Sequence, residues 1–178
     1  CDDAAMVGYM LMPFRRMLGD LGVERIDQIN GKMLQLRSAV KRRQKPGHVI
    51  LLAKNQSGLR NLYKLISLSH LEHFHRFPIM PKSLINENRE GLIVGSACEA
   101  GELYRAIVTR ESDEHIRRIA EFYDFLEVQP IGNNAFMIRE GKVSGEKELQ
   151  DFNKYIIELG ERMGKPVVAT GDVHFLRK

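Results

Sequence analysis

The stretch LIVGSACEAGELYRAIV, residues 92–108, passes from an apolar run to a helical pattern within a few residues. Its first part, residues 92–96, is a short continuous apolar run that predicts a buried strand. Its second part, from Glu99 to Val108, predicts a helix, and Cys98 lies between the two. A strand followed closely by a helix is the repeating unit of an α/β fold.

The same alternation extends in both directions from this stretch. Three more apolar segments predict strands: HVILLAK, DFLEVQ and VVATG, at residues 48–54, 124–129 and 167–171. Stripes of apolar residues predict helices between them, at residues 59–69, 112–122 and 149–163. The last helix is expected to stop at Gly164, ahead of Pro166. Four strands separated by helices predict an α/β fold with parallel strands, arranged as a sheet or barrel.

The first 47 residues do not follow this pattern. Residues 3–18 predict a helix that Gly19 and Gly22 break, and residues 23–47 have weak periodicity and predict a junction. The junction carries the basic run KRRQK at residues 41–45, which we interpret as a solvated connector rather than a nucleic-acid site.

Composition narrows the class of protein. With 178 residues, 43% hydrophobic and 28% charged, the chain is long enough for one domain with a real core. The net charge of +4 permits contact with nucleic acid without demanding it. No apolar run approaches the roughly 20 residues of a membrane helix. Two cysteines give no disulfide framework and favour a reducing cytoplasm, and the start at Cys1 suggests a piece of a longer protein.

Three polar side chains follow predicted strands, where parallel α/β folds collect functional groups. Asp172 and His174 have one residue between them, so they face the same side of an extended segment and could share a ligand. The alternative is an N-cap aspartate and a surface histidine. Cys98 is expected at a helix N-terminus, which favours the thiolate and suits metal binding, whereas a small buried residue is the alternative.

The histidines outside this group are weaker candidates. His48 opens a strand, and the parallel arrangement puts it at the opposite end of the sheet from Cys98. His70, His73 and His75 form the knot HLEHFH, whose spacing could bind zinc on a helix. No cysteine or carboxylate is well spaced beside them, so we interpret this knot as a solvated surface turn.

Taken together, four segments resemble one family. They are HVILLAKNQSGLRNLYKLISLSHLEHF, RFPIMPKSLI, REGLIVGSACEAGELYRAIV and GKPVVATGDVHFL, which begin at residues 48, 76, 89 and 164. They resemble the later half of the polymerase-and-histidinol-phosphatase (PHP) domain in PolC-type bacterial DNA polymerase III alpha subunits. In those enzymes a proofreading 3′–5′ exonuclease interrupts the PHP domain, and DDAAMVGYML, residues 2–11, is similar to its last helix.

The resemblance implies a fold and a division of the chain. Residues 1–22 would be the C-terminal helix of a truncated exonuclease, residues 23–47 a junction, and residues 48–178 the C-terminal half of a PHP domain. The second part would be a partial PHP-type (βα) barrel with parallel strands. Half a barrel exposes strand edges and apolar surface, so the isolated chain is expected to be marginally stable.

The resemblance also implies a set of site residues. His48, Cys98, Asp172 and His174 would be ligands of a multi-metal site holding zinc or manganese, and Asp3 would hold a catalytic magnesium in the exonuclease. Imidazole, thiolate and carboxylate together suit zinc or a similar transition metal. Magnesium would also serve the polymerase site of the parent enzyme.

The implied activity belongs to the parent: DNA-templated DNA synthesis with 3′–5′ proofreading. DNA, deoxynucleoside triphosphates, a sliding clamp and other replisome subunits would be its partners, in the cytoplasm and without a membrane. This chain alone, which lacks the family's earlier ligands and the polymerase domains, is expected to be inactive. Two alternatives stay open: a free-standing PHP-type metal-dependent phosphoesterase, and a non-catalytic PHP scaffold.

Overall fold

The computed structural model describes residues 46–171 continuously and, before them, residues 15–16, 18–20, 22–23, 25 and 27–29. The chain divides into two compact units, residues 1–45 and 46–178. The basic run at residues 41–45 and most of the helix expected at residues 3–18 lie outside the described residues.

In the first unit, residues 15–16 and 18–20 are helical. The turn after them is closed by two backbone hydrogen bonds, from Gly22 N to Gly19 O and from Val23 N to Leu18 O, both 2.9 Å long. Gly22 has a φ of +69°, which glycine adopts without the steric cost that other residues meet. The expected break therefore comes at Gly22, whereas Gly19 is still helical.

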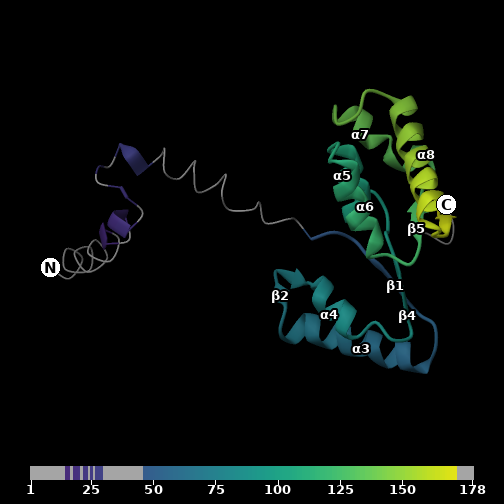
Figure 1. The fold of residues 1–178 in the computed structure, drawn as a ribbon, viewed down its shortest axis with the longest axis horizontal. Helices are drawn as coiled ribbons and strands as arrows, with labels where there is room; N and C mark the ends of the chain where they lie inside the picture. Colours follow the sequence, from purple (N-terminus) through teal and green to yellow (C-terminus); the bar gives the residue numbers. More distant parts are fainter. Residues whose placement is uncertain are drawn as a thin grey trace. The chain divides into compact units, whose positions relative to one another are not determined.

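The second unit alternates strands and helices. Its elements are β1 (Ile50–Ala53), α3 (Gln56–Leu71), β2 (Phe74–His75), β3 (Phe77–Pro78), α4 (Lys82–Glu87), β4 (Leu92–Gly95), α5 (Glu102–Val108), α6 (Asp113–Glu121), β5 (Leu126–Val128), the 3₁₀ helix η1 (Ile131–Asn134), α7 (Phe136–Arg139), α8 (Glu146–Met163) and β6 (Val167–Ala169). Figure 1 shows α3 and α4 at one end of β1 and β4, and α5 to α8 at the other end.

The helix boundaries follow from local capping. The Asn55 side chain accepts a hydrogen bond from Gly58 N and begins α3, and Ser112 in the same way accepts one from His115 N and begins α6. α8 ends at Gly164, which has a left-handed φ of 62°. The four predicted strands and the helices around them are thus confirmed, and sequence reasoning missed the shorter elements β2, β3, α4, η1 and α7.

The expectation that all strands run parallel is wrong for β1. This strand pairs antiparallel with β4, and the register places Ile50 opposite Gly95 and Ala53 opposite Leu92. The physical reason lies in the connection, which contains two helices and a hairpin instead of one crossover helix. This connection brings the chain back to the C-terminal end of β1, where Lys54 N donates to Gly91 O at 2.8 Å.

The other three strands keep the expected direction. A parallel bridge joins Gly95, at the end of β4, to Phe125, and β5 pairs parallel with β6 from Leu126–Val167 onward. β4 is buried as predicted, whereas β6 is not, because Val168 is 37% exposed. The described strands pair two by two, so the partial barrel stays a prediction.

One contiguous core lies under β4, β5 and the helices that cover them. Its fully buried side chains include Leu65, Ile85, Val94, Leu103, Leu126, Leu149 and Ile156. Large apolar side chains stay exposed on α3 and the β2–β3 hairpin, among them Tyr63, Leu71, Phe74 and Phe77. Among the residues described, every helix is too short or too polar to cross a membrane.

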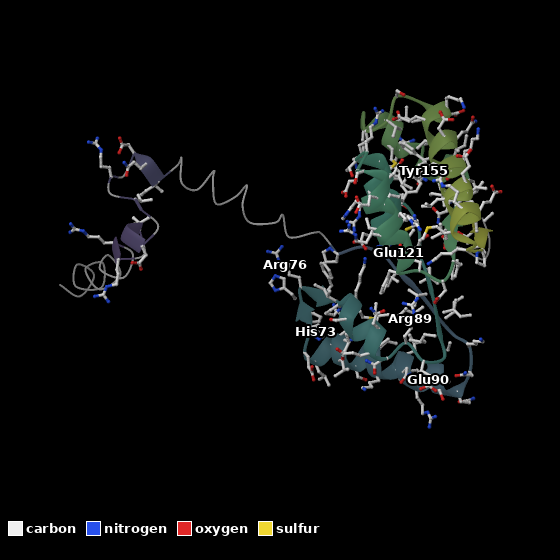
Figure 2. All side chains as sticks on the ribbon, in the orientation of Figure 1. His73, Arg76, Arg89, Glu90, Glu121 and Tyr155 are labelled. Carbon is white, nitrogen blue, oxygen red and sulfur yellow. The ribbon has the colours of Figure 1, made fainter. Side chains whose placement is uncertain are left out.

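Arg89 links the α3–α4 group to the end of α6 (Figure 2). Its guanidinium donates to Phe122 O at 2.7 Å and to Asp124 Oδ1 at 2.9 Å. The second carboxylate oxygen of Asp124 accepts from the backbone N–H of Val94 at 2.7 Å. One ion pair therefore ties the connection before β4 to the segment that enters β5.

Candidate metal centre

His48 and Cys98 lie together although they are distant in sequence. The imidazole Nδ1 of His48 is 3.3 Å from the Sγ of Cys98. The antiparallel pairing of β1 with β4 explains the contact, because His48 precedes β1 at the same edge where Cys98 follows β4. The expectation that His48 lies at the opposite end of the sheet is therefore wrong, and the reason is the direction of β1.

The turn after β4 presents the Cys98 side chain. Ala97 adopts a left-handed φ of 59°, an uncommon conformation for a residue with a side chain. Gly101 N then donates to Cys98 O at 2.8 Å, and His48 N donates to Ala100 O at 3.1 Å. A Cβ at Gly101 would meet Ser96 O at 2.3 Å, so only glycine allows this turn to close.

Cys98 does not lie at a helix N-terminus, contrary to the expectation from sequence. α5 begins at Glu102 with Gly101 as its N-cap, four residues beyond Cys98. The predicted start at Glu99 was too early because residues 97–101 form the turn described above. The helix dipole therefore gives no account of the reactivity of this thiol.

A small pocket with no room for a water molecule adjoins Cys98. Its lining is mostly polar: Ala97, Cys98, Glu99, Tyr104, Glu127, Gln129 and Asn134. Burial raises the pKa of Tyr104 to about 12, against the opposing effect of the hydrogen bond from Asn134 and with a further rise from Glu99. The Tyr104 hydroxyl is therefore neutral at physiological pH.

Sequence reasoning missed Glu127, a carboxylate that is only 7% exposed. Its Oε1 accepts from Thr170 Oγ1 at 2.7 Å and from Gln129 Nε2 at 3.2 Å. The signal available in the sequence was a glutamate inside the apolar run FLEV, where a strand side chain is expected to be apolar.

The other candidates lie outside the described residues. The chain is described up to Gly171, so Asp172 and His174 follow directly after its last described residue, and Asp3 precedes its first. The exit of β6 is described, and Thr170 N donates to Val128 O at 3.1 Å while Asn133 Nδ2 donates to Gly171 O at 3.0 Å. The chain thus enters Asp172 from a position fixed beside β5.

In the described part of the chain, the surroundings of His48 and Cys98 included, no three His, Cys, Asp or Glu side chains are grouped as metal ligands. The HLEHFH knot lies at the end of α3 and on β2, and its side chains are exposed or half-buried. Figure 2 shows His73 and Arg76 at this hairpin end. The prediction that the knot is solvated is confirmed.

The chemistry of the His48–Cys98 pair fits a soft or borderline cation. A tetrahedral zinc ion bound by one imidazole nitrogen and one thiolate sulfur holds those atoms about 3.6 Å apart. The observed 3.3 Å needs only a small adjustment to reach that separation. Two ligands are too few for a site, so the pair needs further donors, and the exit of β6 leads to the nearest candidates in sequence.

The comparisons with known proteins identify a family. The family model for the PHP domain matches residues 5–130, a span that contains both His48 and Cys98. The chain belongs to the PHP-domain family. The match to this PHP chain covers β1, β4 and β5 and ends before β6.

Three curated relatives of this PHP chain are each named DNA polymerase III PolC-type. This chain is 49% identical over 177 residues to the DNA polymerase III PolC-type of Clostridium perfringens, and the match covers 98% of this chain and 12% of that protein. It is 46% identical over 169 residues to the protein of that name from Caldanaerobacter subterraneus, covering 95% of this chain and 12% of the relative. For the Bacillus subtilis protein the identity is 41% over 174 residues, with 98% and 12% covered. The chain therefore spans about an eighth of the length of these relatives.

Proposed function

We propose that this chain is a segment of a PolC-type DNA polymerase III alpha subunit and supplies the later half of its PHP domain. The observation that carries the proposal is the contact between His48 Nδ1 and Cys98 Sγ, two of the residues that the resemblance names as ligands. Relatives named DNA polymerase III PolC-type match nearly the whole chain at 36–49% identity.

In this proposal His48, Cys98, Asp172 and His174 hold zinc or manganese. His48 would supply an imidazole nitrogen and Cys98 a thiolate, both from the same end of the antiparallel pair β1–β4. Asp172 and His174, which follow β6 in the sequence with one residue between them, would supply a carboxylate and a second imidazole. When bound, such ions activate water and stabilise negative charge on a phosphate. The pocket lined by Cys98 and Glu127 would lie beside the ions.

The first 47 residues take a different part in the proposal. Residues 1–22 would be the end of the proofreading 3′–5′ exonuclease, with Asp3 as a magnesium ligand, and residues 23–47 the junction to a partial PHP-type barrel. Similarity to the PolC-type relatives extends across this region, since the match to the Clostridium perfringens protein covers 177 residues. That extent supports a polymerase segment over a free-standing PHP phosphoesterase.

The remaining activities belong to the intact polymerase. It would synthesise DNA on a template from deoxynucleoside triphosphates in the cytoplasm, with a sliding clamp and other replisome subunits as partners. The segment by itself would be inactive, because it supplies four of the ligands that several ions share.

The test compares bound metal in the full-length protein, in two site variants and in one control variant. Zinc and manganese are measured by mass spectrometry after gel filtration, in the wild type and in the double variant Asp172→Ala/His174→Ala. Cys98→Ser is the second site variant, and His73→Ala/His75→Ala is the matched control, because it removes two histidines from the solvated hairpin.

We expect both site variants to lose bound metal and the control to keep it. Equal metal content in all four proteins would leave the non-catalytic scaffold as the better account. Hydrolysis of a model phosphodiester that disappears with the metal, while DNA synthesis continues, would show that the PHP site is itself catalytic.

A further inference from the structure

We propose that Glu127 is a positioning residue of the metal site, which holds the exit of β4 and the exit of β6 at a set distance. The role rests on the proposed function, because it concerns the residues that would bind the metal. Glu127 itself is on β5, the strand between the two exits.

The backbone of Glu127 holds the exit of β4. Its N–H donates to Ser96 Oγ at 3.0 Å, and Ser96 is buried two residues before Cys98. Ser96 N in turn donates to Phe125 O at 3.3 Å. Both the backbone N–H and the hydroxyl of Ser96 are therefore hydrogen-bonded to residues 125 and 127. These two bonds fix the position from which the Cys98 turn begins.

The carboxylate of Glu127 holds the exit of β6. Its Oε1 accepts a hydrogen bond of 2.7 Å from Thr170 Oγ1, two residues before Asp172. This hydrogen bond restrains the exit of β6. Thr170 N also donates to Val128 O, and Gly171 O accepts from Asn133 Nδ2, so the last two described residues before Asp172 are held in place.

The surroundings of Glu127 indicate more than a structural bond. Burying a carboxylate is costly unless hydrogen bonds or a cation compensate its charge. Glu127 lines the same pocket as Cys98, and there the buried oxygens Gln129 Oε1 and Asn134 Oδ1 have no hydrogen-bond donor. Partners behind metal ligands typically change metal affinity 10- to 100-fold when removed.

The experiment measures zinc affinity and the cobalt spectrum of the full-length protein. Affinity comes from competition with a chromophoric chelator. The absorption of the Co²⁺-loaded protein reports the Cys98 thiolate bond and the coordination geometry, which a loss of general stability alone would not change. Three variants are compared with the wild type: Thr170→Val, Glu127→Ala and the double variant.

We expect Thr170→Val and Glu127→Ala each to weaken zinc binding about 10-fold or more and to shift the cobalt bands. The double variant should lose no more than Glu127→Ala, because both changes remove the same hydrogen bond. Glu127→Gln keeps a neutral acceptor for Thr170 and should recover affinity to within about threefold of the wild type.

Two matched controls separate position from stability. Thr109→Val removes a hydroxyl that donates to Arg105 O at the end of α5, and Glu148→Gln alters a hydrogen-bonded carboxylate on α8. Both should keep the wild-type affinity and spectrum. Wild-type affinity in Thr170→Val and Glu127→Ala, while the wild type binds metal, would overturn the role of Glu127 alone. A wild type that binds no metal would overturn the metal site and this role with it.

Discussion

The Nδ1 atom of His48 lies 3.3 Å from Cys98 Sγ across 50 positions of sequence. The contact exists because β1 is antiparallel to β4, so that the start of one strand adjoins the exit of the other. A parallel β1 would have placed His48 a strand length away. The candidate metal centre therefore depends on the direction of a single strand.

The turn that presents Cys98 should not tolerate a side chain at Gly101. In Gly101→Ala the new Cβ would lie 2.3 Å from Ser96 O and 2.9 Å from Cys98 O, so the turn must open. We expect a loss of about 1–3 kcal/mol in the free energy of unfolding, measured with urea, together with weaker zinc binding. Gly132→Ala is the control, because a Cβ there meets nothing within 4 Å, and it should leave both quantities unchanged.

The start of α3 should be equally sensitive to a side chain at Gly58. A Cβ in Gly58→Ala would lie 1.8 Å from Gly91 O, a backbone atom that cannot rotate away. Urea unfolding should show a loss of about 2–3 kcal/mol or more. Gln56→Ala, an exposed change in the same turn of the helix, should be nearly neutral, and equal stability of the two variants would contradict the close approach.

Asp124 should contribute more to stability than an ordinary surface carboxylate. Asp124→Ala leaves the buried Val94 N–H without its acceptor and removes the partner of Arg89. The expected cost is about 1–2 kcal/mol, since an unsatisfied buried donor keeps its desolvation penalty. Asp151→Ala breaks the exposed pair with Lys147 and should cost less than about 0.5 kcal/mol. Thermal unfolding of the two variants side by side makes the comparison.

Stability in acid should depend on Glu148. Hydrogen bonds from the Ser144 backbone and side chain, followed by the contact with Arg110, lower the pKa of this carboxyl in the folded protein. The folded state therefore favours the ionised form, so the stabilisation is present above the unfolded pKa and is lost as pH falls through the lower folded pKa. Melting temperatures across the acid range should fall less steeply for Glu148→Gln than for the wild type. If the melting temperatures of the two proteins fell equally steeply with pH, Glu148 would contribute nothing to the loss of stability in acid.

Much of the second unit was predictable because its signals are local. Apolar runs such as residues 92–96 identify strands, and the stripe on residues 149–163 together with Gly164 identifies α8 and its end. These patterns depend on side chains within one or two turns of each other. The short elements were missed because two-residue strands and a six-residue helix have too few positions for a period to appear.

The site was predictable only in part. Cys98 and His48 were named as candidates from resemblance. Their proximity depends on the antiparallel direction of β1, whereas the alternation of strands and helices predicted a parallel one. Glu127 was missed because nothing adjacent to it in sequence explains a buried carboxylate. Its partners Ser96 and Thr170 lie 31 and 43 positions away.

The sequence by itself determined which longer segments become strands and helices, where α8 ends, and which family the chain resembles. Only the tertiary structure decided that β1 reverses against β4, that an imidazole meets a thiol at their shared edge, and that Glu127 holds two strand exits. The physical reason is one of range. Capping and periodicity act between near neighbours, whereas strand direction is set by where a connection of some 40 residues returns the chain, and buried polar partners are known only once it has returned.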